Sequence, residues 1–194
     1  MTFTILENFP QDLLDELKAI WAESDWYKEL EASPGAMWHH CLRSSHPIFE
    51  RFPEETRTVE FYSNPPHTAN GPHLDRGRWS AMNIPIDIDH DNSYFMTGKT
   101  HLLSVYDRKT WLDKDESAHG HKVKNTHGPT GFFKEEEGKF DYYNLEKPVL
   151  FSTKTPHGFA NNSDRSRVLC SVTFDLTYEQ MMNILPPEWF GDVL

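Results

Sequence analysis

The feature that most restricts the fold is a series of short, strand-forming segments that follow one another with no helical pattern between them. These segments are Thr58–Tyr62, Arg78–Ile86, Thr100–Asp107, Pro148–Thr153 and Arg167–Leu176. Strands joined without intervening helices pair antiparallel and bury one face against a second layer. The sequence therefore predicts a mainly β fold of the α+β class, built as a β-sandwich or barrel with helices packed outside it.

The last of these segments has two faces of different character. Its apolar face is formed by Val168, Cys170, Val172, Phe174 and Leu176, and its mixed face by Arg167, Leu169, Ser171, Thr173 and Asp175. Alternate residues of a strand point to opposite sides of the sheet. We expect the apolar face to lie in a core, with Cys170 as a buried free thiol.

Helical patterns flank the strands. Apolar residues at i, i+1, i+4, i+7 and i+8 predict an amphipathic helix over Pro10–Ser24, and residues 1–57 together read as helical and irregular support. A second, short helix is expected at Tyr178–Leu185, where Thr177 and Gln180 form a capping box. A length of 194 residues fits one domain spanning 1–194.

One long stretch, residues 108–140, carries many charges and few apolar residues. A segment of this length inside a compact domain is usually a functional insertion or a lid over a site. A solvated surface excursion is the other interpretation, and the sequence leaves both open.

Charge and composition exclude several classes of protein. The formal net charge of −11 disfavours nucleic acids and anionic membrane surfaces as partners, because both need clustered basic residues. The first residues lack the basic and apolar regions of a signal peptide, and we find no apolar stretch of about 20 residues. Two cysteines are too few for a disulfide framework. We expect a soluble, cytoplasmic protein, and its oligomeric state is open.

Four residues together suggest chemistry. His73 and Asp75 are two apart and share one face in extended backbone, and His157 follows the segment Pro148–Thr153. Two histidines and one carboxylate form the facial triad that holds non-haem Fe(II) and leaves positions open for other ligands. Arg167 lies ten residues after His157 and offers a planar fork to a carboxylate.

The pattern His73-x-Asp75, then His157, then Arg167 resembles the Fe(II)/2-oxoglutarate-dependent dioxygenases, of the prolyl-hydroxylase type. The matching phrases are PHLDRGRWSAMNIPI and PVLFSTKTPHGFANNSDRSRVLCSVTF, within residues 58–176. The resemblance implies a double-stranded β-helix, or jelly-roll, core with flanking helices. It implies that His73, Asp75 and His157 hold catalytic iron and that Arg167 binds the far carboxylate of 2-oxoglutarate.

The same resemblance implies a reaction. O2 and the cosubstrate 2-oxoglutarate would give succinate, CO2 and an oxidant that hydroxylates an amino acid, a peptidyl residue or a small metabolite. Asp75 supports hydroxylation, since a halogenating relative would lack this carboxylate. Asn83 and Tyr62 are candidate hydrogen-bond donors to 2-oxoglutarate, although a structural role is equally consistent with the sequence for Asn83 and is favoured for Tyr62.

Several alternatives remain open. Arg165 shares the strand parity of Arg167 and is the rival carboxylate clamp, while Arg76 and Arg78 are candidates for contact with an acidic substrate group. A competing metal cluster is His119, His121 and His127, although its flanks lack strand patterning and favour a solvated loop. The rival functions are a cupin-like metalloenzyme that does not use 2-oxoglutarate and a non-catalytic jelly-roll binding module.

Overall fold

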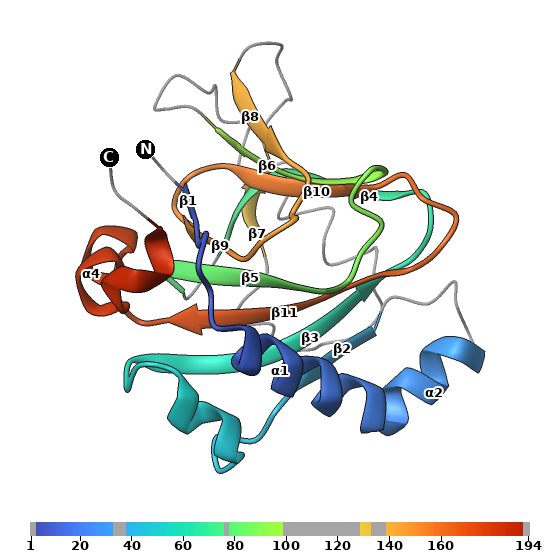
Figure 1. The fold of residues 1–194 in the computed structure, drawn as a ribbon. Helices are drawn as coiled ribbons and strands as arrows, with labels where there is room; N and C mark the ends of the chain where they lie inside the picture. Colours follow the sequence, from blue (N-terminus) through green and yellow to red (C-terminus); the bar gives the residue numbers. More distant parts are fainter. Residues whose placement is uncertain (1–2, 33–37, 76–77, 99–128, 133–138, 192–194) are drawn as a thin grey trace.

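The chain folds into two antiparallel sheets that face each other, with helices on the outer side of one of them (Figure 1). The computed structural model describes residues 3–32, 38–75, 78–98, 129–132 and 139–191. In the described part of the chain, the larger sheet has the order β1 (Phe3–Ile5), β9 (Val149–Ser152), β5 (Ser80–Asp87), β11 (Arg167–Phe174), β3 (Thr56–Asn64) and β2 (Trp38–Cys41). The smaller sheet has the order β7 (Pro129–Phe132), β4 (Thr68–Asp75), β10 (His157–Asn161), β6 (Ser93–Gly98) and β8 (Phe140–Tyr143).

Helices cover the outer face of the larger sheet. In Figure 1, α1 (Gln11–Glu23) and α2 (Asp25–Ala32) run below β3 and β11. The other short helices in the described ranges are η1 (Pro47–Arg51), α4 (Tyr178–Ile184) and η2 (Pro187–Phe190). None of the helices in the described ranges is both long and apolar enough to cross a membrane.

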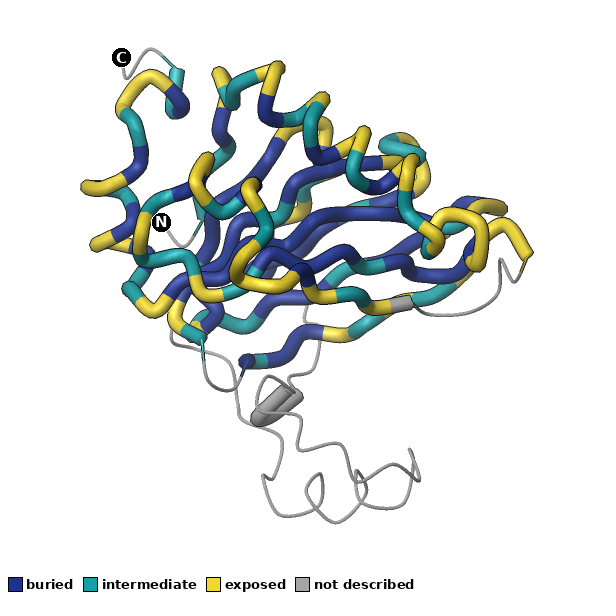
Figure 2. Tube along the Cα trace, turned by 90° about the horizontal axis from the view of Figure 1, so that it is seen from below, coloured by how far each residue is buried: buried dark blue, intermediate teal, exposed yellow. Residues whose placement is uncertain are grey.

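Strand β11 divides the interior into two cores, as its alternation predicts. Its residues Val168, Cys170, Val172 and Phe174 are buried in the outer cluster, which also contains Leu13, Leu17 and Trp21 of α1. Leu169 belongs instead to the inner cluster between the sheets, with Phe95, Leu145 and Phe151. Figure 2 shows the strands as mostly buried and the helices as buried along one side only. Cys170 is a buried free thiol, as expected.

The predicted jelly-roll class and the terminal helices are confirmed. Helix α1 has its predicted extent to within one residue at each end, and α4 begins directly after its N-cap Thr177, with Gln180 at N3 completing the predicted capping box. Helix α2 was not predicted. The expected strand Thr100–Asp107 lies outside the described residues, as does most of 108–140, but residues 129–132 form β7 and pair with β4.

Strands β4, β6 and β10 were also not predicted. The β4 sequence TANGPHLD and the β10 sequence HGFAN contain glycine and asparagine, and β4 a proline, all of which are poor strand formers. Each of the two strands pairs on both sides, β4 with β7 and β10, and β10 with β4 and β6. Tertiary pairing therefore imposes an extended backbone that local propensity does not indicate.

Candidate metal centre

Two neighbouring strands of the smaller sheet bring the predicted triad together. β4 carries His73 and Asp75 on one face, and His157 is the first residue of β10. His73 and His157 are direct partners across the antiparallel pair, and their ring centroids are 4.6 Å apart. All three side chains are buried, and their ligand atoms lie within 4.8 Å of one another. Residues 82 apart in the sequence thus form one compact site.

Backbone carbonyl groups set the orientation of both imidazole rings. His73 Nδ1 lies 2.8 Å from the carbonyl oxygen of Gly71, and His157 Nδ1 lies 2.9 Å from that of Thr155. A carbonyl oxygen only accepts, so each Nδ1 carries the proton and donates it. The other ring nitrogen, Nε2, faces Asp75 in both histidines, at 3.5 Å for His73 and 3.1 Å for His157. This tautomer and this second hydrogen bond are typical of metal-binding histidines.

The charges around the triad favour the protonation states that bind a metal. Burial lowers the pKa of His73 to about 4, with a further contribution from His157, so the ring is neutral at pH 7. Burial alone would raise the pKa of Asp75, but His157 and Arg78 together hold it well below its usual range. An ionised carboxylate and a neutral imidazole are the forms in which these groups coordinate.

Arg78 is the direct partner of Asp75. Its Nε and Nη2 lie 2.7 Å and 2.5 Å from the same oxygen, Oδ2, and both side chains are largely buried. Thr153 anchors the arginine by donating from Oγ1 to the Arg78 carbonyl oxygen at 2.7 Å. Sequence reasoning considered Arg78 only as a possible substrate contact, because the three-residue spacing gave no sign that it would turn back to Asp75.

Gly158 is required next to His157 by the close approach of β10 to β4. A Cβ at this position would lie 2.5 Å from the Asn70 carbonyl oxygen and 3.0 Å from the carbonyl group of Gly71. The register of the two strands shifts at the same point, between His157 and Phe159. The Gly71 carbonyl also accepts the hydrogen bond from His73. The close approach that glycine at 158 permits therefore affects the backbone beside both histidines.

Arg167 is a buried cation, and no carboxylate of the described residues forms an ion pair with it. It is 1% exposed, lies 4.8 Å from the centroid of the Phe159 ring, and has no hydrogen-bond partner for Nε and Nη1 among the described residues. Burial lowers its pKa to about 9. Its rival Arg165 is instead half-exposed and forms a 2.6 Å ion pair with Asp87. A buried, unpartnered guanidinium is costly unless a ligand supplies an anion.

The other two candidate residues also lie on the inner face of the larger sheet. Asn83 of β5 is the register partner of Ser171 on β11, and Tyr62 of β3 is the partner of Leu169. The Tyr62 hydroxyl donates to Glu60, a buried carboxylate that the sequence did not single out. Glu60 has the same strand parity as Tyr62, so the strand pattern alone placed it on this face.

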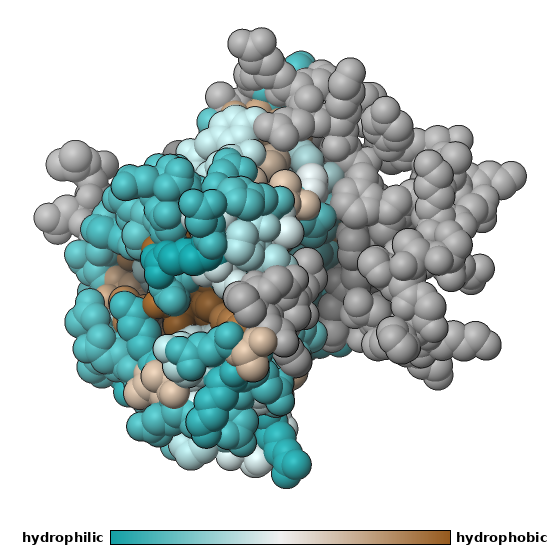
Figure 3. All heavy atoms as spheres, turned by 90° about the vertical axis from the view of Figure 1, so that its right-hand side faces the viewer, coloured by the Kyte–Doolittle hydropathy of each residue, from teal (hydrophilic) through white to brown (hydrophobic). Residues whose placement is uncertain are grey.

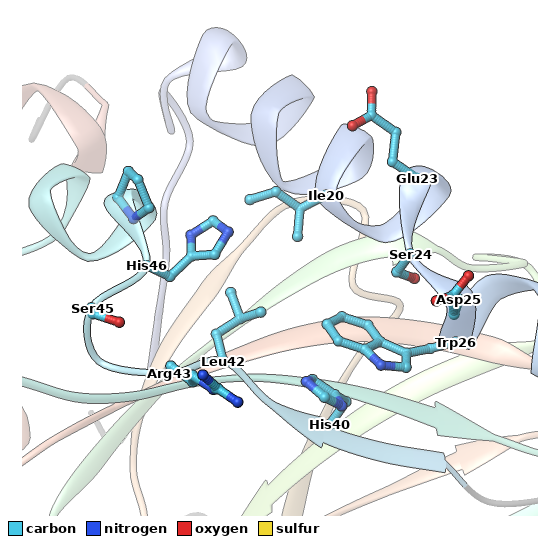
Figure 4. Close-up of a pocket in the computed structure, with 11 residues that line it drawn as sticks. Ile20, Glu23, Ser24, Asp25, Trp26, His40, Leu42, Arg43, Ser45 and His46 are labelled. Carbon is cyan, nitrogen blue, oxygen red and sulfur yellow. The ribbon is translucent and has the colours of Figure 1, made fainter.

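A separate hollow lies on the outer side of the molecule. It has a volume of about 660 Å³ and lies between α1, α2 and the segment after β2 (Figure 4). In its wall, Trp26 stacks on His40 with ring centroids 3.4 Å apart. Figure 3 shows apolar surface at the bottom of a hollow rimmed by hydrophilic residues. None of the triad residues lines the 660 Å³ hollow. The rival cluster of His119, His121 and His127 lies outside the described residues.

Comparisons with known proteins support the fold. No protein-family model matches the chain, and no curated protein matches it significantly in sequence. A prolyl-4-hydroxylase from Pseudomonas putida is similar with a TM-score of 0.54 over 89% of this chain and 91% of that one, at 12% identity. The epimerase SnoN, solved with Fe3+, alpha ketoglutarate and nogalamycin RO, gives a TM-score of 0.51 over 89% of this chain and 78% of its own, at 11% identity. At these identities the likeness shows a shared jelly-roll fold, in agreement with the resemblance noted in the sequence.

Proposed function

We propose that the chain is an Fe(II)- and 2-oxoglutarate-dependent dioxygenase that hydroxylates a small-molecule or peptidyl substrate. The observation that carries the proposal is the pairing of two features on facing sheets. One is the His73, Asp75 and His157 triad, and the other is the buried, unpartnered guanidinium of Arg167. A purely structural metal would need no carboxylate clamp beside it.

The donor set fits the metal and the cosubstrate. Two imidazole nitrogens and one carboxylate are ligands that suit non-haem Fe(II) and leave coordination positions open. Arg167 Nε and Nη1 are donors with no partner among the described residues, and a carboxylate can accept hydrogen bonds from both. When bound, Fe(II) and 2-oxoglutarate would react with O2 to give succinate, CO2 and the oxidant that hydroxylates the substrate.

The protein's own residues bind and orient. Arg167 would fix the far carboxylate of 2-oxoglutarate, and its guanidinium is available for this because no carboxylate in the described ranges competes for it. Arg78 holds one oxygen of Asp75, so the other oxygen stays directed toward His73. Phe151 and Phe95 pack near the His157 ring, at centroid distances of 4.9 Å and 6.4 Å, and exclude water from that side. Tyr62 and Asn83 remain candidate contacts to the cosubstrate.

The test requires no knowledge of the substrate. Anaerobic protein loaded with Fe(II) should develop the visible charge-transfer band of a chelated keto acid when 2-oxoglutarate is added. The band should be lost in His157→Ala, whereas Arg167→Ala should require far more 2-oxoglutarate to develop it. Arg165→Ala is the matched control and should behave as the wild type, because Arg165 pairs with Asp87 at the surface.

Each negative result identifies a different alternative. Iron binding without a band on addition of 2-oxoglutarate would favour the cupin-like metalloenzyme. A protein that binds no iron would fit the non-catalytic binding module instead.

A further inference from the structure

A row of side chains crosses the inner face of the larger sheet, facing the metal-binding strands. The strand register aligns Cys41 of β2, Glu60 of β3, Ser171 of β11 and Asn83 of β5. Arg167 lies on the same face of β11, four residues before Ser171, which corresponds to about 13 Å along a strand. The face therefore carries two buried charges of opposite sign in separate places, Arg167 and Glu60.

Glu60 is a buried carboxylate whose described contacts include no permanent cation. It is 3% exposed, and its Oε2 accepts from the Tyr62 hydroxyl and lies 3.2 Å from His39 Nε2. Burial alone would raise the pKa of Glu60, but the hydrogen bonds from His39 and Tyr62 lower it to about 2, so the group is an anion at neutral pH. His39 balances this charge only while its half-exposed ring is protonated.

The neighbours of Glu60 are neutral, apart from His39 and from Arg78, which is paired with Asp75. Burial, with Glu60 itself, raises the pKa of Tyr62 far above its usual range and raises that of the Cys41 thiol, so both stay uncharged. Arg78 is near enough to help lower the pKa of Glu60, but its Nε and Nη2 are engaged by Asp75, and its Nη1 forms no hydrogen bond with Glu60 or with any other described residue. A buried charge left with neutral donors is stabilised when a ligand brings the opposite charge.

We infer that Glu60 is the specificity-determining residue of the substrate site and binds a cationic nitrogen of the substrate, a primary ammonium or a guanidinium group. The inference rests on the proposed function and adds the class of substrate to it. Its location supports this assignment. Glu60 is the register partner of Ser171, which also pairs with Asn83, on the face of the larger sheet that is opposed to the triad strands β4 and β10.

The experiment uses the full chain loaded anaerobically with Fe(II) and 2-oxoglutarate. The probes are L-lysine, L-arginine and their acetylated amides, each compared with a neutral isostere, L-norleucine or L-citrulline and the corresponding amides. Binding is measured as perturbation of the charge-transfer band, and succinate release is then measured in air. We expect at least one cationic probe to bind ten-fold or more tightly than its isostere, and we expect Glu60→Gln to remove this preference while the affinity for 2-oxoglutarate is retained.

Two further variants separate recognition from a structural role. Glu60→Asp keeps the charge and should restore part of the preference. His39→Gln removes the side chain that competes for Glu60, so the preference for a cationic probe should be kept or increased. If Glu60 served only as the counter-ion of His39, the losses in His39→Gln and Glu60→Gln would be equal. If the band forms but no cationic probe is preferred, or the preference survives in Glu60→Gln, the substrate class is wrong and the proposed function stands. If no band forms, the proposed function itself fails.

Discussion

Arg78 holds Asp75 by one oxygen only. Both its Nε and its Nη2 approach Oδ2, and Oδ1 is left toward His73. A carboxylate fixed in this way already has its other oxygen in the orientation that a metal ligand needs. The arginine is thus a positioning residue for the metal centre rather than a ligand.

Replacing this arginine should weaken metal binding. We expect Arg78→Met to raise the dissociation constant for Fe(II) by about 10- to 100-fold, which is the usual effect of removing a partner that orients a ligand. Anaerobic titration with Fe(II) measures this dissociation constant. Arg165→Met is the control, because it makes the same substitution at an arginine on the surface. An unchanged affinity for Fe(II) in Arg78→Met would show that Asp75 keeps its orientation without Arg78.

Removing the Asp75 carboxylate should abolish the activity. Asp75→Ala takes away one of three metal-binding groups and leaves the buried Arg78 without its anion. We expect the loss of coupled succinate formation and a stability loss of about 3–5 kcal/mol in the metal-free protein. Chemical denaturation and a succinate assay give the two numbers. Wild-type turnover in this variant would rule out the triad.

Arg167 should stabilise the complex and destabilise the protein that lacks 2-oxoglutarate. Because the buried guanidinium has two unpartnered nitrogens, Arg167→Met should make the protein without cosubstrate more stable by about 1–4 kcal/mol. The same change should raise the dissociation constant for 2-oxoglutarate strongly. Melting temperatures measured with and without 2-oxoglutarate test both effects together. A variant that is less stable in both conditions would contradict the assignment of Arg167 as an anion-binding residue.

A methyl group at position 158 should disturb both histidines. Gly158→Ala places Cβ against the backbone of Asn70 and Gly71, so the two strands must move apart. We expect a loss of about 1–3 kcal/mol in the free energy of unfolding, together with weaker Fe(II) binding. Gly71→Ala is the matched control, because a Cβ there meets no atom within 4 Å. Equal effects of the two substitutions would mean that the close approach at 158 has no special role.

The ionisation of Glu60 should be visible in the pH dependence of stability. Its folded-state pKa of about 2 lies below its ordinary value of 4.5, so the folded protein binds fewer protons than the unfolded chain between these values. The carboxylate therefore contributes stability above pH 4.5 and loses it as the pH falls toward 2. Integrated over this range, the contribution is about 3 kcal/mol.

Denaturant unfolding of wild type and Glu60→Gln measures this contribution. The stability of the wild type relative to Glu60→Gln should decrease with falling pH over the range in which both remain folded. A difference that does not change with pH would show that the Glu60 pKa is the same in both states.

Strand parity predicted the inner face of the fold and much of the site. The alternation in the last strand separated the outer apolar face from the face that carries Arg167, and the i, i+2 spacing placed His73 and Asp75 on one side of β4. Arg165 and Arg167 have the same parity, and the sequence favoured Arg167 because the strand pattern begins directly after it; in the structure Arg167 is buried, whereas Arg165 is half-exposed and paired with Asp87.

The rest depends on contacts between distant segments. Strand β10 begins at His157 and is extended because it pairs with β4 and β6. Its own sequence, with one glycine and one asparagine in five residues, does not indicate a strand. The role of Arg78 depends on the backbone turn between Asp75 and β5. Glu60 is different, because its parity within Thr58–Tyr62 could have identified it as an inward-facing carboxylate.

The pairing of His73 with His157 also determines when the site can exist. The two histidines are partners in a register between strands separated by more than eighty residues, and a slip of that register by one residue would turn one imidazole to the opposite face. A chain still folding therefore has no assembled triad, and a metal ion at this site would be bound only after the smaller sheet has formed. Occupancy by the metal then reports completed folding, and melting temperatures should rise with the concentration of free metal.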